Sequence, residues 1–376
     1  MIIAFRVDAS DIIGTGHVYR CLNLAHQYKD NHTIYFICKN HPYHLISKIE
    51  EMYQVFQIKL EKNNNITLDM NTWLGENEIQ DAEKIIYIIQ ENQLQIDWLI
   101  IDHYAINETW ENKVSPYVKN ICVIDDFTNR KHNCNMLINQ QITHEEGIIK
   151  YKNIINPNCK IYCGNNYLLL HPKYFEYRTI EKKYEKHFLE RINIFMGGAD
   201  TYNITEKIID VCYKFNQEQQ QENKIFFDII IGKSNKHYQQ IQEKLNKLNH
   251  ILYENKNKNK NVVYFNLYYN LEFVGDLFEK ADLCIGAPGC TSYERCLMKV
   301  PSLCICIAEN QKKILDKFIE SNTIKYLGTI EDNYIDKLIY YLDYFQKNSN
   351  ELKIMSLNCK KLIDIKENQI KYILNI

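Results

Sequence analysis

Short apolar runs alternate with longer stretches of helical period along this chain, and the alternation predicts an α/β fold with parallel sheets. The apolar runs are rich in β-branched residues, as expected for buried strands. In the first half of the chain we predict strands at Ile2–Val7, Thr33–Cys38, Trp98–Asp102, Asn120–Ile124 and Met136–Ile138. In the second half we predict strands at Ile192–Met196, Ile225–Ile231, Val262–Phe265, Leu283–Ile285 and Ser302–Ile307.

This strand pattern starts twice, which predicts two domains, and 376 residues are enough for two separate cores. A charged, strand-poor stretch from Lys173 to Arg191 separates the two halves. We place the boundary within it, with an N-terminal domain at 1–178 and a C-terminal domain at 179–376 that ends in a helix. Two doubly wound domains of this kind face a cleft and bind ligands at the carboxyl ends of their strands.

Charge and cysteine content exclude several classes of function. The 45 basic and 47 acidic residues nearly cancel, which argues against a nucleic-acid-binding protein with a large basic surface. The 13 cysteines form no CxxC pair, so we expect reduced, buried thiols and no zinc site. The sequence has no signal-peptide pattern and no apolar segment of membrane-spanning length. We therefore expect a cytoplasmic protein, and a monomer.

The segment that follows the first predicted strand combines glycines with a histidine. Gly14 and Gly16 precede His17, and a helical pattern begins at Val18. A strand, a glycine-rich turn and a helix N-terminus together form an anion site, because glycines admit a ligand and free amides face it. Histidine is suited to proton transfer near neutral pH. A tight turn with a helix-capping histidine is the alternative explanation.

Polar residues also follow two later strands of the first half. Asp102, His103 and Tyr104 come directly after the apolar run Trp98–Ile101, and Asp125 and Asp126 follow the next predicted strand. The aspartate pair could bind sugar hydroxyls, orient an imidazole or cap the next helix. Because parallel strands present their carboxyl ends at the same edge of a sheet, we expect these residues to lie near the histidine.

The second half contains two further glycine loops. Gly198 lies in a Gly-Gly turn after a predicted strand, with Asn203 just beyond it, and such a turn is compatible with phosphate. The segment from Gly286 places the hydroxyl of Ser292 at a predicted helix start and Glu294 in the first turns. Hydroxyls and amides suit a diphosphate, and a carboxylate accepts two hydrogen bonds from a ribose. A capping box is the alternative, but Ser292 is too near Glu294 for its spacing.

Taken together, these blocks resemble a known family, the UDP-2,4-diacetamido-2,4,6-trideoxy-β-L-altropyranose hydrolases of pseudaminic acid biosynthesis. That family is related to the two-domain, GT-B-like fold of the lipid II-forming N-acetylglucosaminyltransferase. The resemblance covers most of the chain. The matching blocks are Arg6–Ala25, Asp102–Asn107, Val123–Cys134, Asn139–Gln140, Tyr167–Tyr174, Phe195–Thr205, Gly286–Leu303 and Ala308–Gln311.

The resemblance implies two Rossmann-like domains and hydrolysis of a UDP-linked diacetamido sugar to free sugar and UDP, with inversion and without metal or cofactor. It implies His17 as the catalytic base. The positions implied to bind the UDP-sugar substrate are Asn203, Glu294, Asn310, Tyr104 and Asp102. To these we add Gly14, Gly16, Gly198 and Ser292 from the loops described above.

The chain also departs from the family pattern. Pro288 stands where a second glycine is usual, and Cys290 stands where serine is usual. Proline removes an amide that could bind phosphate. Extra sequence lies around Glu50–Gly75 and at the C-terminus. Two alternatives stay open, a glycosyltransferase on the same framework and a non-catalytic nucleotide-sugar-binding protein. The presence of His17 favours the hydrolase.

Overall fold

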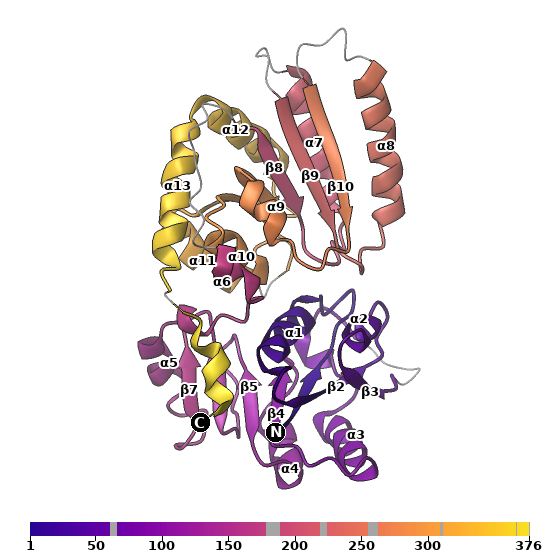
Figure 1. The fold of residues 1–376 in the computed structure, drawn as a ribbon, viewed down its shortest axis with the longest axis vertical. Coiled ribbons are helices and arrows are strands. Elements are labelled where there is room, and N and C mark those ends of the chain that lie inside the picture. Colours follow the sequence, from indigo (N-terminus) through magenta and orange to yellow (C-terminus); the bar gives the residue numbers. More distant parts are fainter. Residues whose placement is uncertain are drawn as a thin grey trace. The chain divides into compact units, whose positions relative to one another are not determined.

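The computed structural model describes residues 1–60, 66–177, 189–218, 224–254, 262–308, 311–365 and 367–375. The chain forms two compact units. Unit 1 comprises Met1–Pro172 and Ile365–Ile376, and unit 2 comprises Lys173–Asp364. Each unit contains one sheet in which every neighbouring pair of strands is parallel, with helices packed on the sheet (Figure 1). The predicted α/β class is confirmed.

Unit 1 is built on a seven-stranded sheet with the order β3-β2-β1-β4-β5-β6-β7. Its strands are β1 (Ile2–Val7), β2 (Thr33–Lys39), β3 (Gln54–Ile58), β4 (Trp98–Asp102), β5 (Ile121–Ile124), β6 (Met136–Asn139) and β7 (Lys160–Cys163). Its α-helices are α1 (Gly16–Tyr28), α2 (Ile46–Glu50), α3 (Glu78–Glu91), α4 (Glu108–Val114) and α5 (His144–Tyr151). Short 3₁₀ turns are η1 (Met70–Thr72), η2 (Ser115–Tyr117), η3 (Asn165–Tyr167) and η5 (Gln369–Asn375).

Both faces of this sheet are buried, each in its own hydrophobic core. Successive side chains of a strand point to opposite faces, so one strand contributes to both cores. On β1, Ile3 and Phe5 belong to one core together with Leu24 of α1. Between them, Ala4 belongs to the other core together with Ile85 of α3. This double burial explains why the central strands read as continuous apolar runs.

Unit 2 is built on a six-stranded sheet with the order β10-β9-β8-β11-β12-β13. Its strands are β8 (Arg191–Phe195), β9 (Lys224–Ile231), β10 (Val262–Tyr269), β11 (Leu283–Gly286), β12 (Ser302–Cys306) and β13 (Ile324–Thr329). Its helices are α6 (Lys173–Tyr177), α7 (Ile204–Glu218), α8 (Tyr238–Glu254), α9 (Gly275–Lys280), α10 (Cys290–Leu297), α11 (Lys312–Glu320), α12 (Tyr334–Lys347) and α13 (Ser349–Leu362).

Each sheet has a point where the order of its strands reverses direction. In unit 1 the chain moves outward from β1 through β2 to β3, then returns to place β4 on the other side of β1. In unit 2, β8 and β11 have the same relation. In unit 1, the loops that follow β1 and β4 run in opposite directions, so they separate at the carboxyl ends of these strands. The loops that follow β8 and β11 do the same in unit 2. Ligands of doubly wound sheets bind at such points.

The ten predicted strands are all present, but three strands were not predicted. These are β3, β7 and β13, and each forms an edge of its sheet. An edge strand has a neighbour on one side only, and the exposed and half-buried positions of β3 and β7 interrupt the apolar run. Among the predicted strands, β10 continues beyond Phe265 to Tyr269.

The division into units differs from the predicted boundary at residue 178. Unit 2 begins at Lys173, and the end of the chain returns to unit 1. There, η5 buries Ile370 in the unit 1 core, and the Tyr28 hydroxyl donates to the Ile370 carbonyl at 2.7 Å. The apolar side chains of this last segment need a core to cover them, which sequence periodicity could not locate.

Candidate active site

The loop between β1 and α1 holds His17 in the first turn of the helix. Ser10 forms an isolated bridge with Gly14, and its hydroxyl accepts from the Ile13 amide at 2.9 Å. Gly14 has a φ of 82°, a conformation that side chains with a Cβ seldom adopt. The helix begins at Gly16, two residues before the predicted start at Val18. The histidine is therefore presented by a helix N-terminus directly after the strand.

His17 is paired with Asp102, the last residue of the neighbouring strand β4. The imidazole Nδ1 lies 2.7 Å from Asp102 Oδ1. An ionised carboxylate can only accept, so Nδ1 carries the proton and Nε2 has a free lone pair when the ring is neutral. Arg20 Nη2 lies 3.4 Å from the same Nδ1, which is too far to compete with the 2.7 Å contact. The pair leaves Nε2 as the proton acceptor.

Arg20, one helical turn after His17, fixes this carboxylate. Its guanidinium donates to both oxygens of Asp102, each at 2.6 Å, and to Asp126 Oδ2 at 2.7 Å. Burial alone would raise the pKa of Asp102, but the charge of Arg20, with that of His17, outweighs burial and holds the pKa well below its usual range. Asp102 therefore stays ionised behind the imidazole.

Aromatic rings surround the histidine. The ring of Tyr104 meets the His17 ring edge to face, with centroids 4.4 Å apart, and its hydroxyl donates to Asp126 Oδ2 at 2.6 Å. Trp73 stacks on Tyr104 with centroids 5.6 Å apart, and Phe127 lies edge to face at 4.6 Å. Burial, with the charge of Asp126, raises the pKa of Tyr104, so its hydroxyl remains protonated. These rings place apolar surface beside the imidazole.

His103 does not join the hydrogen bonds around His17, although it stands between Asp102 and Tyr104 in sequence, and its ring lies edge to face with Trp73 with centroids 6.5 Å apart. Its Nε2 is 3.4 Å from Asp8 Oδ2, in a group of buried charges that includes Arg6 and Asp81. Burial lowers the pKa of His103 to about 4. Successive residues at the end of a strand point to opposite faces, and this separates His103 from its neighbours.

Asp125 and Asp126 also separate. Asp126 joins the Arg20 cluster, whereas Asp125 pairs with Arg130 at 2.6 Å and accepts from the Thr128 amide at 2.9 Å. Asp125 also lies 3.9 Å from His132 Nε2. The carboxylate in contact with the His17 imidazole is that of Asp102, one of the residues implied to bind substrate. The carboxylate of Asp102 is fully buried and engaged by His17 and Arg20.

In unit 2, the loop after β8 shapes the start of α7. Asp200 accepts from the amides of Ile204 and Thr205, both at 2.9 Å, and so caps the helix. Gly198 packs so closely on the next loop that a Cβ on Gly232 would lie 2.6 Å from its Cα. Asn203 has a φ of 51°, and among the described residues no donor reaches its Oδ1. The side-chain Nδ2 of Asn203 donates to the Glu206 carboxylate at 2.5 Å.

The loop after β11 leads into α10, whose N-cap is Gly289. Glycine has no side chain with which to cap the helix, and the Ser292 amide donates to the Gly289 carbonyl at 2.9 Å. Pro288 precedes the N-cap, so the amide that it lacks is not one of the first-turn amides of the helix. Ser292 is buried, and its hydroxyl accepts from Arg295 Nη2 at 3.0 Å. The Ser292 hydroxyl thus helps to fix the Arg295 guanidinium.

Glu294 lies in the second turn of α10 and is half-buried. Burial raises the pKa of Glu294 to about 7, although the hydroxyl of Tyr174 donates to its carboxylate and Arg295 is nearby. A carboxylate that titrates near neutrality is unusual, and such groups gather at functional sites. Asn310, the remaining predicted residue, lies outside the described residues.

The structure thus brings together His17, Asp102 and Tyr104 in unit 1, and it adds Arg20 and Trp73, which the sequence analysis missed. The three-residue spacing of His17 and Arg20 places both on one helical face, a signal that was readable in the sequence. Trp73 follows η1 in an irregular segment with no periodicity, so no sequence signal was available for it. In unit 2, Gly198 and Asn203 follow β8, and Ser292 and Glu294 follow β11.

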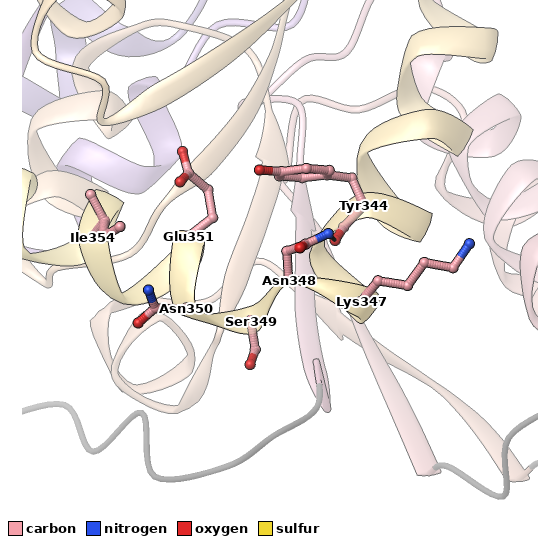
Figure 2. Close-up of a pocket in the computed structure, with 7 residues that line it drawn as sticks. All are labelled: Tyr344, Lys347, Asn348, Ser349, Asn350, Glu351 and Ile354. Atoms are coloured by element: carbon pink, nitrogen blue, oxygen red, sulfur yellow. Dashed lines mark hydrogen bonds between the residues drawn. The ribbon is translucent and has the colours of Figure 1, made fainter.

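A surface hollow lies at the turn between α12 and α13, lined by Tyr344, Lys347, Asn348, Ser349, Asn350, Glu351 and Ile354 (Figure 2). None of the predicted site residues lines it. Across the described ranges, we find no group of three or more His, Cys, Asp and Glu side chains arranged to hold a metal ion. Within those same ranges, the helices are too short or too polar to span a bilayer.

Two curated proteins resemble the chain in sequence. The UDP-2,4-diacetamido-2,4,6-trideoxy-β-L-altropyranose hydrolase of Campylobacter jejuni is 25% identical over 320 residues, which are 83% of this chain and 94% of that protein. An uncharacterised protein of Methanocaldococcus jannaschii is 23% identical over 340 residues, or 89% of this chain and 61% of that protein. No protein-family model matches the chain.

Solved structures share the fold. MurG of Acinetobacter baumannii has a TM-score of 0.58 at 10% identity, covering 99% of this chain and 97% of its own. A UDP-glucosyltransferase from Polygonum tinctorium has a TM-score of 0.63 at 10% identity, and the match covers 100% of this chain and 97% of that protein. These likenesses confirm the predicted GT-B-like fold, and at this identity they show the fold alone.

Proposed function

We propose that the protein is a nucleotide-sugar hydrolase that cleaves a UDP-linked 2,4-diacetamido-2,4,6-trideoxy hexose to free sugar and UDP. The observation that carries the proposal is the His17–Asp102 pair at the strand-order reversal of unit 1. The likeness to the Campylobacter hydrolase, which extends over 94% of that protein, supports the choice of substrate and reaction.

In this mechanism, His17 Nε2 accepts a proton from water as the water attacks the anomeric carbon. The bond between this carbon and the UDP oxygen breaks, and UDP leaves with the electron pair. Asp102 holds the proton on Nδ1 and stabilises the imidazolium that forms, with its own charge fixed by Arg20. A positioned base contributes roughly 10²- to 10⁴-fold to such a step. The inverted sugar and UDP are then released.

The nucleotide belongs to unit 2 in this proposal. The first-turn amides of α10, after Gly286 and Gly289, bind the diphosphate, and the helix dipole favours its charge. Glu294 accepts hydrogen bonds from the ribose hydroxyls, and Asn203 offers its unpaired Oδ1 to the substrate. Because hydrogen bonds from these amides stabilise the negative charge of the leaving UDP, the reaction needs no metal ion. We therefore expect EDTA to leave the rate of UDP release unchanged.

A glycosyltransferase is the second candidate, because MurG and the Polygonum glucosyltransferase share the fold. The same base would then activate an acceptor hydroxyl in place of water. A non-catalytic nucleotide-sugar-binding protein is less consistent with the site, since binding alone does not need a histidine oriented by a buried carboxylate.

Hydrolysis in ¹⁸O-labelled water tests the proposal. Attack of water on the anomeric carbon places the label in the free sugar and leaves UDP unlabelled, as mass spectrometry of both products would show. Label in UDP would mean attack at phosphorus and would refute the mechanism. Release of UDP only after an acceptor is added would establish the transferase.

A further inference from the structure

Two buried polar atoms beside His17 lack hydrogen-bond partners among the described residues, Trp73 Nε1 and Asp126 Oδ1. Trp73 is 4% exposed and Asp126 is 6% exposed. Leaving a buried donor or acceptor unpaired costs about 1–3 kcal/mol, and native structures rarely retain such groups without a reason. One of the atoms is a donor only and the other an acceptor only. Together they match a ligand that has both an acceptor and a donor.

Both residues contact Tyr104, so they belong to one cluster. The Tyr104 hydroxyl donates to Asp126 Oδ2, which also accepts from Arg20, and this leaves Oδ1 as the free oxygen. The ring of Tyr104 stacks on Trp73, and the Trp73 ring lies 6.1 Å from the His17 ring. The two residues that carry the unpaired atoms are therefore held by fixed contacts in the cluster that contains the proposed base.

We propose that Trp73 and Asp126 form a subsite for an acetamido group of the sugar. The amide N–H of the substrate donates to Asp126 Oδ1, and its carbonyl accepts from Trp73 Nε1. This inference rests on the proposed function and adds to it the residues that select a diacetamido sugar over a simple hexose.

An amide suits the cluster better than a sugar hydroxyl does. A secondary amide carries its N–H and C=O on separate atoms that point in opposite directions, so it can satisfy two residues at once. Its methyl group also needs apolar surroundings, which the rings of Trp73, Tyr104 and Phe127 supply. A hydroxyl would leave those rings without an apolar partner.

The test is Trp73→Phe, which keeps an aromatic ring beside Tyr104 and removes the indole N–H. Three substrates are compared by UDP release: the diacetamido sugar and two analogues with a hydroxyl in place of one acetamido group, at C2 or at C4. We expect kcat/KM of the variant to fall about tenfold on the diacetamido sugar, which corresponds to one lost hydrogen bond. On one of the two analogues this penalty should disappear.

Trp110→Phe is the matched control. The Trp110 indole N–H donates to Asp81 Oδ1 at 2.9 Å, so its loss affects stability but should not change the ratio of kcat/KM between substrates. Such a ratio is independent of the fraction of folded enzyme. An equal penalty on all three substrates, or no penalty at all, would overturn the subsite alone. Absence of UDP release by the wild-type protein would overturn the proposed function and the subsite with it.

Discussion

Replacing Asp102 with asparagine tests whether this carboxylate orients His17. The amide has nearly the same size, but its NH₂ group can donate to Nδ1, and the ring proton then moves to Nε2. The lone pair that accepts the proton from water is lost. Arg20 keeps its ion pair with Asp126 at 2.7 Å, so its charge retains a partner in the variant.

The magnitude follows from the role of the base. Loss of general-base catalysis lowers kcat by roughly 10²- to 10⁴-fold, which is about 3–5 kcal/mol of activation free energy. KM should change little, because the buried Asp102 side chain has no free face for a ligand. Initial rates of UDP release over a range of substrate concentrations separate kcat from KM, and circular dichroism confirms folding.

Asp97→Asn is the control, because Asp97 precedes the same strand β4 at its other end and pairs with Lys119. This variant should keep wild-type kinetics. A folded Asp102→Asn protein with wild-type kcat would refute the orienting role. A rise in KM with unchanged kcat would instead assign Asp102 to substrate binding.

Three further outcomes follow from single residues. Because the pKa of Glu294 is raised to about 7, uridine affinity should fall about tenfold per pH unit below pH 7 in calorimetric titrations, and Glu294→Gln should abolish this dependence. Gly286→Ala should lower the free energy of unfolding by about 1–3 kcal/mol, because its Cβ would lie 2.4 Å from the Phe195 carbonyl oxygen. Gly289→Ala should lower it by less than about 1 kcal/mol, because no described atom lies within 4 Å of the added Cβ. Contacts with nearby carboxylates outweigh burial and raise the pKa of His132 from 6.5 to about 9. The wild-type protein should therefore lose about 3 kcal/mol of stability as pH rises from 6.5 through 9, and urea titrations of His132→Gln should show no such loss.

The sequence was sufficient to predict the fold class, because central strands buried on both faces read as unbroken apolar runs. It was insufficient for three of the four edge strands, β3, β7 and β13. In β7, Lys160 is exposed and the next two residues are only half-buried, so no continuous apolar signal marks the strand. The return of the last segment to unit 1 was also beyond prediction, since Ile370 and its neighbours show only that a core is needed.

The proximity of His17 and Asp102 was predictable from the ends of the strands. His17 follows β1 and Asp102 ends β4, and the parallel pairing of these strands brings their ends together. The contact of Asp102 with the imidazole of His17 was not predictable, because it depends on which face the Asp102 side chain occupies at the end of β4. Trp73 comes from an irregular segment, and its contact with Tyr104 is formed only by the tertiary fold.

The most direct test of the account is phosphorus NMR of the purified protein with the UDP-linked diacetamido altropyranose, without acceptor or added metal. We expect the wild-type protein to release UDP, and we expect His17→Ala to bind UDP but to release almost none from the substrate. Equal rates of release by the two proteins would contradict the assignment of His17 as the base. Binding of substrate without any release of UDP by the wild-type protein would contradict hydrolysis itself.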